Sequence, residues 1–207
     1  MREAAIVVAL VVVGLSAASA EGQTVFTGGA KGGITFATLP AAGTELDADT
    51  GYRMGALAGG FVAVEFGGMY AFQPEFLYAM KGVELSYQGY TQKDAIELSY
   101  LEIPLLFRIS PRTNGRVGFD LFAGPAVSFR MSAKFKSEFG DQTDGMDLKD
   151  EVNTTDVGLV VGGGIHIGKV LIEARWTEGL IDASDRDSFE KDLKNRAFSI
   201  LVGFKFR

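Results

Sequence analysis

The feature that most constrains this chain is an alternation of apolar and polar residues, clearest in residues 100–109 (YLEIPLLFRI). Leu101, Phe107 and other apolar residues occupy odd positions there, whereas Glu102 and Arg108 occupy even positions. A period of two predicts a β-strand with one apolar face and one face that holds charge. Seven further segments alternate similarly, so the sequence predicts eight strands, near residues 29–37, 52–66, 70–87, 97–110, 115–134, 156–168, 169–181 and 196–206.

The connections between these strands alternate in length. The first, third, fifth and seventh are long, and their Asp and Glu residues outnumber Lys and Arg by 17 to 5, which keeps such loops solvated. The other three are short. An up-and-down barrel in an outer membrane has short periplasmic turns and longer outer loops. The predicted fold is therefore an all-β, eight-stranded antiparallel up-and-down transmembrane β-barrel in a bacterial outer membrane, with its loops outside and both termini in the periplasm.

The N-terminus has the pattern of a secretory signal peptide. Arg2 precedes an apolar stretch at residues 4–15, and small residues follow it up to Ala20. Cleavage after Ala20 would make residues 1–20 the signal peptide and leave residues 21–207 as one barrel domain. The alternative, a membrane-spanning helix, requires a longer apolar stretch. The chain contains no cysteine, which excludes disulfides, thiolate metal sites and a cysteine nucleophile.

Alternation alone does not decide which face of the strands lies inside the barrel. A soluble, lipocalin-like barrel buries the apolar face, whereas a membrane barrel turns it towards lipid. Glycine weakens the middle of a strand, and a crowded lumen gives it a purpose that a solvated surface does not. Six glycines share the polar face: Gly118, Gly124, Gly158, Gly162, Gly164 and Gly203. Aromatic residues near strand ends on the apolar face also match interfacial girdles. Both observations favour a membrane barrel with a polar lumen.

Several segments resemble a known family. Residues 72–82 (FQPEFLYAMKG), 98–109 (LSYLEIPLLFRI), 122–129 (FAGPAVSF) and the last two predicted strands are similar to strands of small bacterial outer-membrane β-barrel proteins of the PorT-like kind. This resemblance spans the mature chain. It implies an outer-membrane barrel that the barrel-assembly machinery inserts. Relatives are linked to secretion systems, but the resemblance assigns no activity to this chain.

Charged residues on the polar faces of neighbouring strands predict ion pairs inside the barrel. A single antiparallel register that places Glu75 opposite Arg108 also places Lys81 opposite Glu102. Similar reasoning pairs Glu173 with Lys205. We expect these pairs to fill the lumen as a closed network that stabilises the barrel and blocks a pore. The predicted lumen residues are Glu75, Arg108, Lys81, Glu102, Glu173 and Lys205.

Three prolines fall inside predicted strands, namely Pro74, Pro104 and Pro125. Proline has no backbone N–H to donate to a neighbouring strand. Bulges or local bends are therefore expected at these positions.

A group of basic residues is expected near the outer rim: Arg53, Arg130, Lys134, Lys136 and Arg196. Phosphates of lipopolysaccharide lie at this level of an outer membrane. One interpretation is that these residues contact outer-membrane lipid and lipopolysaccharide. The other is that they are solvated rim charges without a ligand.

His166 is the only histidine, and it falls at the predicted periplasmic rim, where a structural role is expected. A lipid-modifying enzyme of this size would need its histidine near the outer rim, with a serine and a carboxylate in reach. Residues 141–151 carry several acids near a glycine but lack the spacing of a helix–loop–helix calcium site. No catalytic residue, metal site, cofactor or nucleic-acid partner is predicted.

Three functions remain open. The leading one is a non-enzymatic outer-membrane protein with a plugged polar lumen, which serves in envelope structure, in adhesion or as a partner of an envelope protein such as an export machine. The second is a narrow passive pore, although side chains fill the interior of most eight-stranded barrels. The third is a lipid-modifying enzyme, which the position of His166 disfavours.

Overall fold

A computed structural model describes residues 24–38, 49–86, 93–112, 116–139, 142–147, 155–180 and 194–206. The predicted signal peptide, residues 1–20, lies outside these ranges. The described chain forms nine strands: β1 (Val25–Thr38), β2 (Asp49–Phe66), β3 (Tyr70–Ser86), β4 (Lys93–Ile109), β5 (Val117–Phe139), β6 (Gln142–Asp147), β7 (Thr155–Ile167), β8 (Val170–Gly179) and β9 (Arg196–Lys205). No helix within the described ranges is long and apolar enough to cross a membrane.

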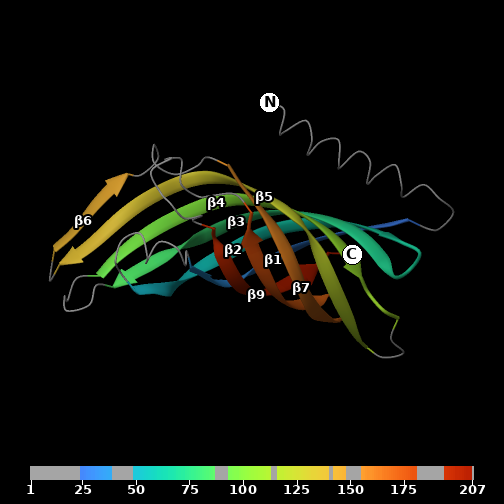
Figure 1. The fold of residues 1–207 in the computed structure, drawn as a ribbon. Coiled ribbons are helices and arrows are strands. Elements are labelled where there is room, and N and C mark those ends of the chain that lie inside the picture. Colours follow the sequence, from blue (N-terminus) through green and yellow to red (C-terminus); the bar gives the residue numbers. More distant parts are fainter. Residues whose placement is uncertain are drawn as a thin grey trace.

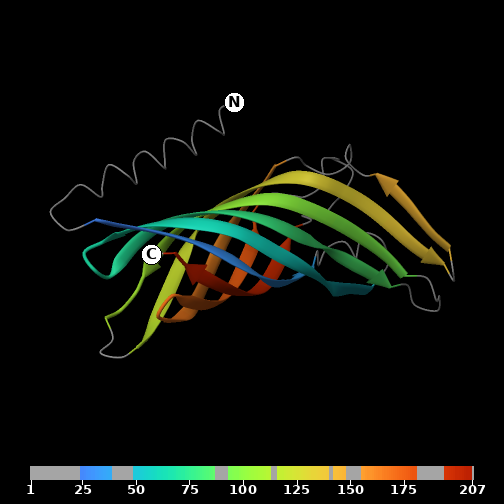
Figure 2. The same ribbon diagram turned by 180° about the vertical axis from the view of Figure 1, so that it is seen from behind.

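Eight of these strands close into a barrel. Each pairs antiparallel with its neighbours in the order β4, β3, β2, β1, β9, β8, β7, β5, and a β4–β5 pairing closes the ring. The predicted eight-stranded antiparallel barrel is therefore confirmed. The β2–β3 and β7–β8 turns lie at one end of the barrel together with the end of β4 and the start of β5, and the strand ends that border the long connections lie at the other (Figures 1 and 2).

The stagger of the barrel follows from the strand pairing. Starting at Gly33 on β1 and stepping between opposed residues through β2, β3 and β4 leads to Arg130 on β5. Stepping the other way, through β9, β8 and β7, leads to Asp120. The two routes meet β5 ten residues apart. Such a stagger tilts the strands, typically by roughly 35–45°, and brings residues from distant strands to the same level of the lumen.

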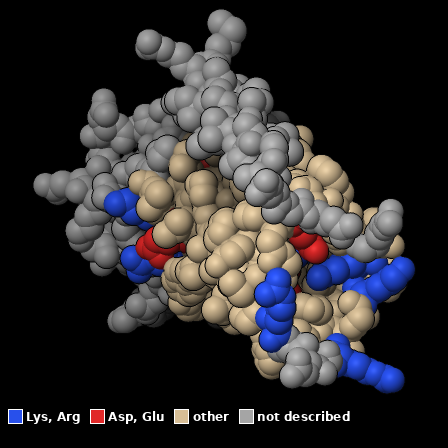
Figure 3. Space-filling view, turned by 90° about the vertical axis from the view of Figure 1, so that its right-hand side faces the viewer, with Lys and Arg blue, Asp and Glu red and all other residues tan. Residues whose placement is uncertain are grey.

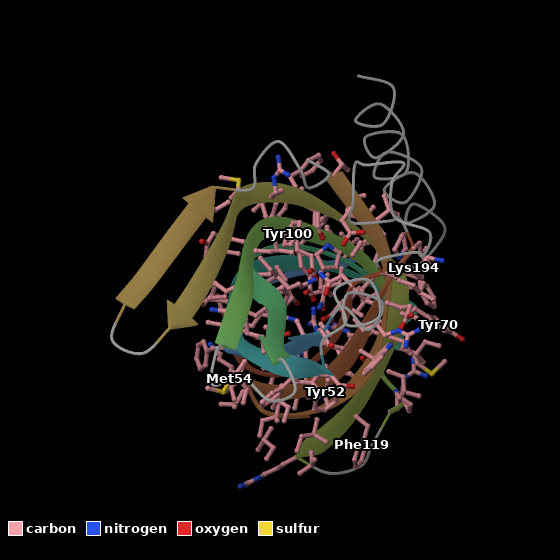
Figure 4. All side chains as sticks on the ribbon, turned by 60° about the vertical axis from the view of Figure 1, so that its left-hand side comes forward. Tyr52, Met54, Tyr70, Tyr100, Phe119 and Lys194 are labelled. Atoms are coloured by element: carbon pink, nitrogen blue, oxygen red, sulfur yellow. The ribbon has the colours of Figure 1, made fainter. Side chains whose placement is uncertain are left out.

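Exposure shows which face of the sheet lies inside. On β9 the outward residues Phe198, Val202 and Phe204 are 37–55% exposed, whereas the alternating Ser199 and Leu201 are buried. Residues 100–109 behave in the same way, because Phe107 is exposed while Glu102 and Arg108 are buried. Figure 4, a view that brings the outer end forward, shows side chains filling the interior and labels Met54, Tyr70 and Phe119 on the outside. The apolar face therefore points outwards, as in a membrane barrel.

The strands extend beyond the predicted limits at the outer end. β5 continues to Phe139, and residues 142–147, which the sequence placed in a loop, return along it as β6. The sequence carries a signal for this hairpin, because Gly140-Asp141 between the two strands is a dipeptide typical of two-residue hairpin turns. The cause is that β5 leaves its partner β7 after Phe129, which frees its edge for another strand.

Of the bulges or local bends expected at the three prolines, the bulges are contradicted by the strand pairing. The strand register is the same before and after Pro74 and Pro104. The two residues that follow Pro74 have no partner in the β3–β4 ladder, and the two that follow Pro104 have none in the β4–β5 ladder. β5 also keeps its register with β7 through Pro125. The register shifts instead between Tyr52 and Leu57 on β2 and between Ser99 and Tyr100 on β4. A missing N–H removes one hydrogen bond and does not require an extra residue.

The arrangement of turns and loops predicts a sidedness that labelling of cells can measure. An epitope tag at Gly145 in β6, or at Ser188, should be accessible on intact cells, because both positions belong to the loop end. A tag at Asn114, between β4 and β5, should be labelled only after permeabilisation. Labelling of Asn114 on intact cells would show that the barrel is inverted or is not in the membrane.

Candidate functional site

Four charged side chains form a compact network in the middle of the lumen. Lys31 from β1 donates hydrogen bonds to Glu75 of β3 and Glu173 of β8, with Nζ–O distances of 2.8–2.9 Å. Arg175 of β8 lies 2.8 Å from Glu75 and 2.6 Å from Glu173 through its Nη atoms. Each side chain is at least 94% buried. The network, which we call the central network, is electrically neutral, with two cations and two anions.

Each of the two cations in the central network also lies against an aromatic ring. Lys31 Nζ lies 4.7 Å from the ring centroid of Phe61, and the guanidinium of Arg175 lies 5.4 Å from that of Phe122. Gly162 makes room for the Phe122 ring, since a Cβ there would come within 2.6 Å of it. A cation against an aromatic face retains part of the stabilisation that water would provide. The glycines on the polar face therefore leave space for large side chains, as predicted.

Sequence reasoning missed the two cations of the central network. Lys31 lies in a glycine-rich stretch, GGAKGG, which superficially resembles a phosphate loop but lacks its spacing. Arg175 is two residues from Glu173 and therefore on the same face of β8. Both could have been found by asking which cations neutralise the buried carboxylates, since an unpaired buried carboxylate is costly.

The predicted register of β3 and β4 is wrong by four residues. Arg108 lies opposite Ala71, not Glu75, and Glu102 lies opposite Leu77. β8 and β9 show the same error, because Glu173 lies opposite Leu201 and not opposite Lys205. A shift by an even number leaves every residue on its predicted face. The ion pairs Glu75–Arg108 and Glu173–Lys205 are therefore absent among the described contacts, although all four residues are on inward faces.

The predicted ion pair between Lys81 and Glu102 is confirmed in spite of the register error. Lys81 Nζ donates to Glu102 Oε2, and both side chains are at least 95% buried. The lysine reaches along the lumen to a residue that is not directly opposite it. Long side chains inside a narrow barrel can therefore form ion pairs with residues that do not lie directly opposite them on the neighbouring strand. Tyr100 lies beside this pair and is also buried in the lumen.

A second group of polar residues, the inner cluster, lies between the central network and the end of the barrel where the β2–β3 and β7–β8 turns lie. Arg108 donates to Gln73 Oε1 at 2.6 Å and to Glu65 Oε1 at 2.8 Å. Gln73 in turn donates to Glu75 of the central network at 2.7 Å. Asp120 on β5 lies 3.9 Å from Arg108 Nε. The inner cluster thus continues the hydrogen-bonded chain from the middle of the barrel towards the end with the short turns.

His166 lies at the end of β7 next to the β7–β8 turn, in contact with Asp120. Its Nδ1 is 2.9 Å from Asp120 Oδ2, and the Ser110 hydroxyl donates to the other oxygen of the same carboxylate. A nucleophilic serine must hydrogen-bond to the histidine that takes its proton. Here the aspartate separates Ser110 from His166, so the three residues do not form a nucleophile–base pair. Gly118 faces the imidazole and leaves space for it.

The basic residues predicted at the outer rim do not share one surface. Arg196 is on the outward face, where its Nε lies 2.7 Å from Glu178. Arg53 donates to the Lys81 carbonyl oxygen at 3.5 Å and alternates with the exposed Tyr52 and Met54, so it is on an inward face. Arg130 is also inward, with a buried Nη1 that has no hydrogen-bond partner. The side chains of Lys134 and Lys136 lie outside the described part of the chain.

The described side chains provide no obvious place for a metal ion. Within these ranges, no three His, Asp or Glu side chains come together in a way that could hold one. The candidate site is therefore the hydrogen-bonded interior itself.

The chain has distant structural likenesses to solved proteins. No curated protein matches the sequence. Among solved structures, Neisserial surface protein A (NspA) is 14% identical, with a TM-score of 0.47 over 87% of this chain and 97% of that one. Ail, the attachment invasion locus protein of Yersinia pestis, is 13% identical, with a TM-score of 0.41 over 87% and 99%. The outer membrane protein OprG from Pseudomonas aeruginosa is 12% identical, with a TM-score of 0.42 over 90% and 98%.

The family comparison covers most of the sequence. Residues 23–185 match the model of the outer membrane protein beta-barrel domain. This match reaches from the start of β1 beyond the end of β8, and it does not separate PorT-like proteins from other members. The chain belongs to the outer membrane protein beta-barrel domain family.

Proposed function

We propose that this protein is a sealed, non-enzymatic outer-membrane barrel that acts through its outer surface, as an adhesion protein or as a partner of another envelope protein. The observation that carries the proposal is the central network. Lys31, Glu75, Glu173 and Arg175 come from three strands and are almost completely buried across the middle of the lumen. Large side chains in this position leave no continuous path for solutes.

The outer end supplies the surface for such a partner. β4 and β5 remain paired as far as Lys93 and Glu138, beyond the last pair of β5 with β7 at Phe129 and Thr155. β6 adds a further strand, and in the described part of the chain β5 is its only partner. The sheet extends well past the barrel at this end (Figure 1). An unpaired strand edge offers backbone donors and acceptors to a strand of another protein.

Other contacts are part of the proposal. The barrel-assembly machinery inserts the chain, and outer-membrane lipid and lipopolysaccharide surround it. Arg196 is the residue of the predicted rim group best placed to meet lipid phosphates, since it is outward and 46% exposed. Passive transport is disfavoured by the central network. Catalysis by Ser110 and His166 is disfavoured because Asp120 separates them.

Electrical recording tests the sealed lumen. The purified barrel in a planar lipid bilayer should show no regular unitary currents, because the central network occupies the lumen. Replacing all four of its residues with serine should introduce conductance, provided that the variant still shows the heat-shifted gel mobility of a folded barrel. Regular openings of the unmodified protein would contradict the proposal and support a passive pore.

Site-specific crosslinking tests the outer surface. A photoreactive amino acid at Asp144 in β6 should capture an outer-membrane or extracellular protein on intact cells, because this strand carries the free edge. The same amino acid at Asn114, between β4 and β5, is the matched control for contacts on the periplasmic side. If both positions capture the same proteins, or Asp144 captures none, the outer sheet is not the binding surface.

A further inference from the structure

A polar cavity of about 310 Å³ lies at the periplasmic end of the lumen, beyond the inner cluster. The β2–β3 turn, residues 110–112 after β4, residues 116–118 at the start of β5 and the ends of β7 and β9 contribute to its walls. Its charged or titratable lining residues are Glu65, Arg108, Arg112, Arg116, His166 and Lys205. This cavity is separate from the central network, because Arg108 and Gln73 lie between them.

The cations that line this cavity outnumber its acids. Arg108 is compensated by Glu65 at 2.8 Å and by Asp120 at 3.9 Å. Arg112 only donates to the neutral carbonyl of Gly67, at 3.0 Å. No carboxylate of the described residues forms an ion pair with Arg112, Arg116 or Lys205. None of these three cations is therefore in direct contact with a carboxylate, although Glu65, Asp120 and Glu173 attract Lys205 from a greater distance. Figure 3 shows Lys and Arg gathering around the rim of this end.

Lys205 differs from the fully solvated cations that are common at the rim of a barrel. It alternates with the outward Phe204 and Phe206, so it is on the inward face of β9 and only partly exposed. Its neighbours in the cavity include the buried Arg108. In the central network and in the Lys81–Glu102 pair, by contrast, each buried lysine or arginine has a carboxylate partner. Arg108 repels the ammonium of Lys205, and partial burial removes some of the water that would solvate it, so an anion bound in the cavity would be favourable.

We propose that this periplasmic cavity binds a phosphate group, with Lys205, Arg112 and Arg116 as its ligands. Guanidinium groups donate two parallel hydrogen bonds to phosphate oxygens, and an ammonium adds a compact positive charge. Arg108 lies at the floor of the cavity, held by its own hydrogen bonds, and adds to the positive potential. Such a phosphate can come from a phospholipid headgroup of the inner leaflet or from a soluble phosphate ester of the periplasm.

Titration with glycerol phosphate, followed by NMR, tests the site on the full mature barrel in an uncharged detergent. At constant ionic strength, saturable shifts should occur at Ser110, Gly118 and His166, which line the cavity. The double variant Arg116→Gln with Lys205→Gln should weaken binding at least about tenfold, because two charge-assisted hydrogen bonds are lost. Arg196→Gln, an outward arginine at the opposite end of the barrel, is the matched control and should leave the affinity unchanged.

A third variant and a second ligand extend the titration. Glu65→Gln removes the acid that lines the cavity and the ion pair that it forms with Arg108. The positive potential in the cavity then rises, so phosphate should bind more tightly. A purely structural role for these residues would not produce tighter binding. A short-chain phosphatidylglycerol added to the micelles identifies the source: shifts with this lipid alone assign a headgroup, whereas shifts with glycerol phosphate assign a soluble ester. The proposal is overturned if neither probe shifts these residues, if the double variant binds equally well, or if Glu65→Gln does not tighten binding.

Discussion

Replacing Arg175 with methionine should strongly destabilise the barrel. Among the described residues, the substitution leaves Lys31 as the one cation that forms ion pairs with Glu75 and Glu173, so the central network acquires a net negative charge. Removing one partner of a buried ion pair typically costs about 3–5 kcal/mol, because the other charge stays buried without compensation. Guanidinium unfolding in detergent, followed by the fluorescence of Trp176, the only tryptophan, measures the difference.

The double variant Glu75→Gln with Arg175→Met is the control for this experiment. It restores neutrality, since Lys31 and Glu173 remain as an ion pair, and glutamine still offers an oxygen to Gln73. We expect it to recover at least half of the stability lost in Arg175→Met. A double variant as unstable as the single one would show that packing of the arginine, and not charge balance, stabilises the lumen.

Val202→Arg should have the next largest effect, because it tests whether lipid covers the outer face. Val202 is 55% exposed, lies in the second half of β9 and points outwards. In water an exposed substitution of this kind usually changes stability by less than about 0.5 kcal/mol. On the lipid face near the bilayer midplane, arginine costs about 2–4 kcal/mol. Unfolding from lipid vesicles into urea measures the cost directly.

Phe206→Arg is the matched substitution near the membrane boundary. Phe206 is also outward, and at 63% it is exposed to a similar degree, but it follows the last residue of β9. The cost at the interface should be only about 0–1 kcal/mol. Equal, small effects at both positions would mean that water surrounds this surface and that the apolar face has another partner.

Period-two alternation and connection length were sufficient to predict the architecture. They identify eight barrel strands, the ends at which turns and loops gather, and the outward direction of residues such as Phe198 and Phe204. These properties depend on local patterns, since each strand must present one face to lipid and one to the lumen. β6 was missed because its residues are polar on both sides and its only strand partner among the described residues is an extension of β5.

The lumen contacts were predicted only in part, and the physical reason is their geometry. Pairing by direct opposition finds residues on adjacent strands, but the central network joins β1, β3 and β8 across the open interior. Which residues lie at the same height in the lumen depends on the stagger of the strands around the whole barrel. This stagger cannot be inferred from the pairing within one hairpin. Lys81–Glu102 was found because both residues are on neighbouring strands and the lysine is long enough to span the register error.

The central network also has a consequence for the order in which the barrel assembles. Lys31 and Glu75 are in the N-terminal half of the chain, whereas Glu173 and Arg175 arrive with β8, next to the strand that closes the ring on β1. Before the seam between β1 and β9 forms, neither half carries a complete set of partners, and water must solvate the charges that remain. We therefore expect closure of the seam to complete the cross-pairs Lys31–Glu173 and Arg175–Glu75 and to expel this water from the lumen. In an open barrel these charged side chains would lack part of their partners, so exposing them to lipid would cost free energy and favour the closed barrel.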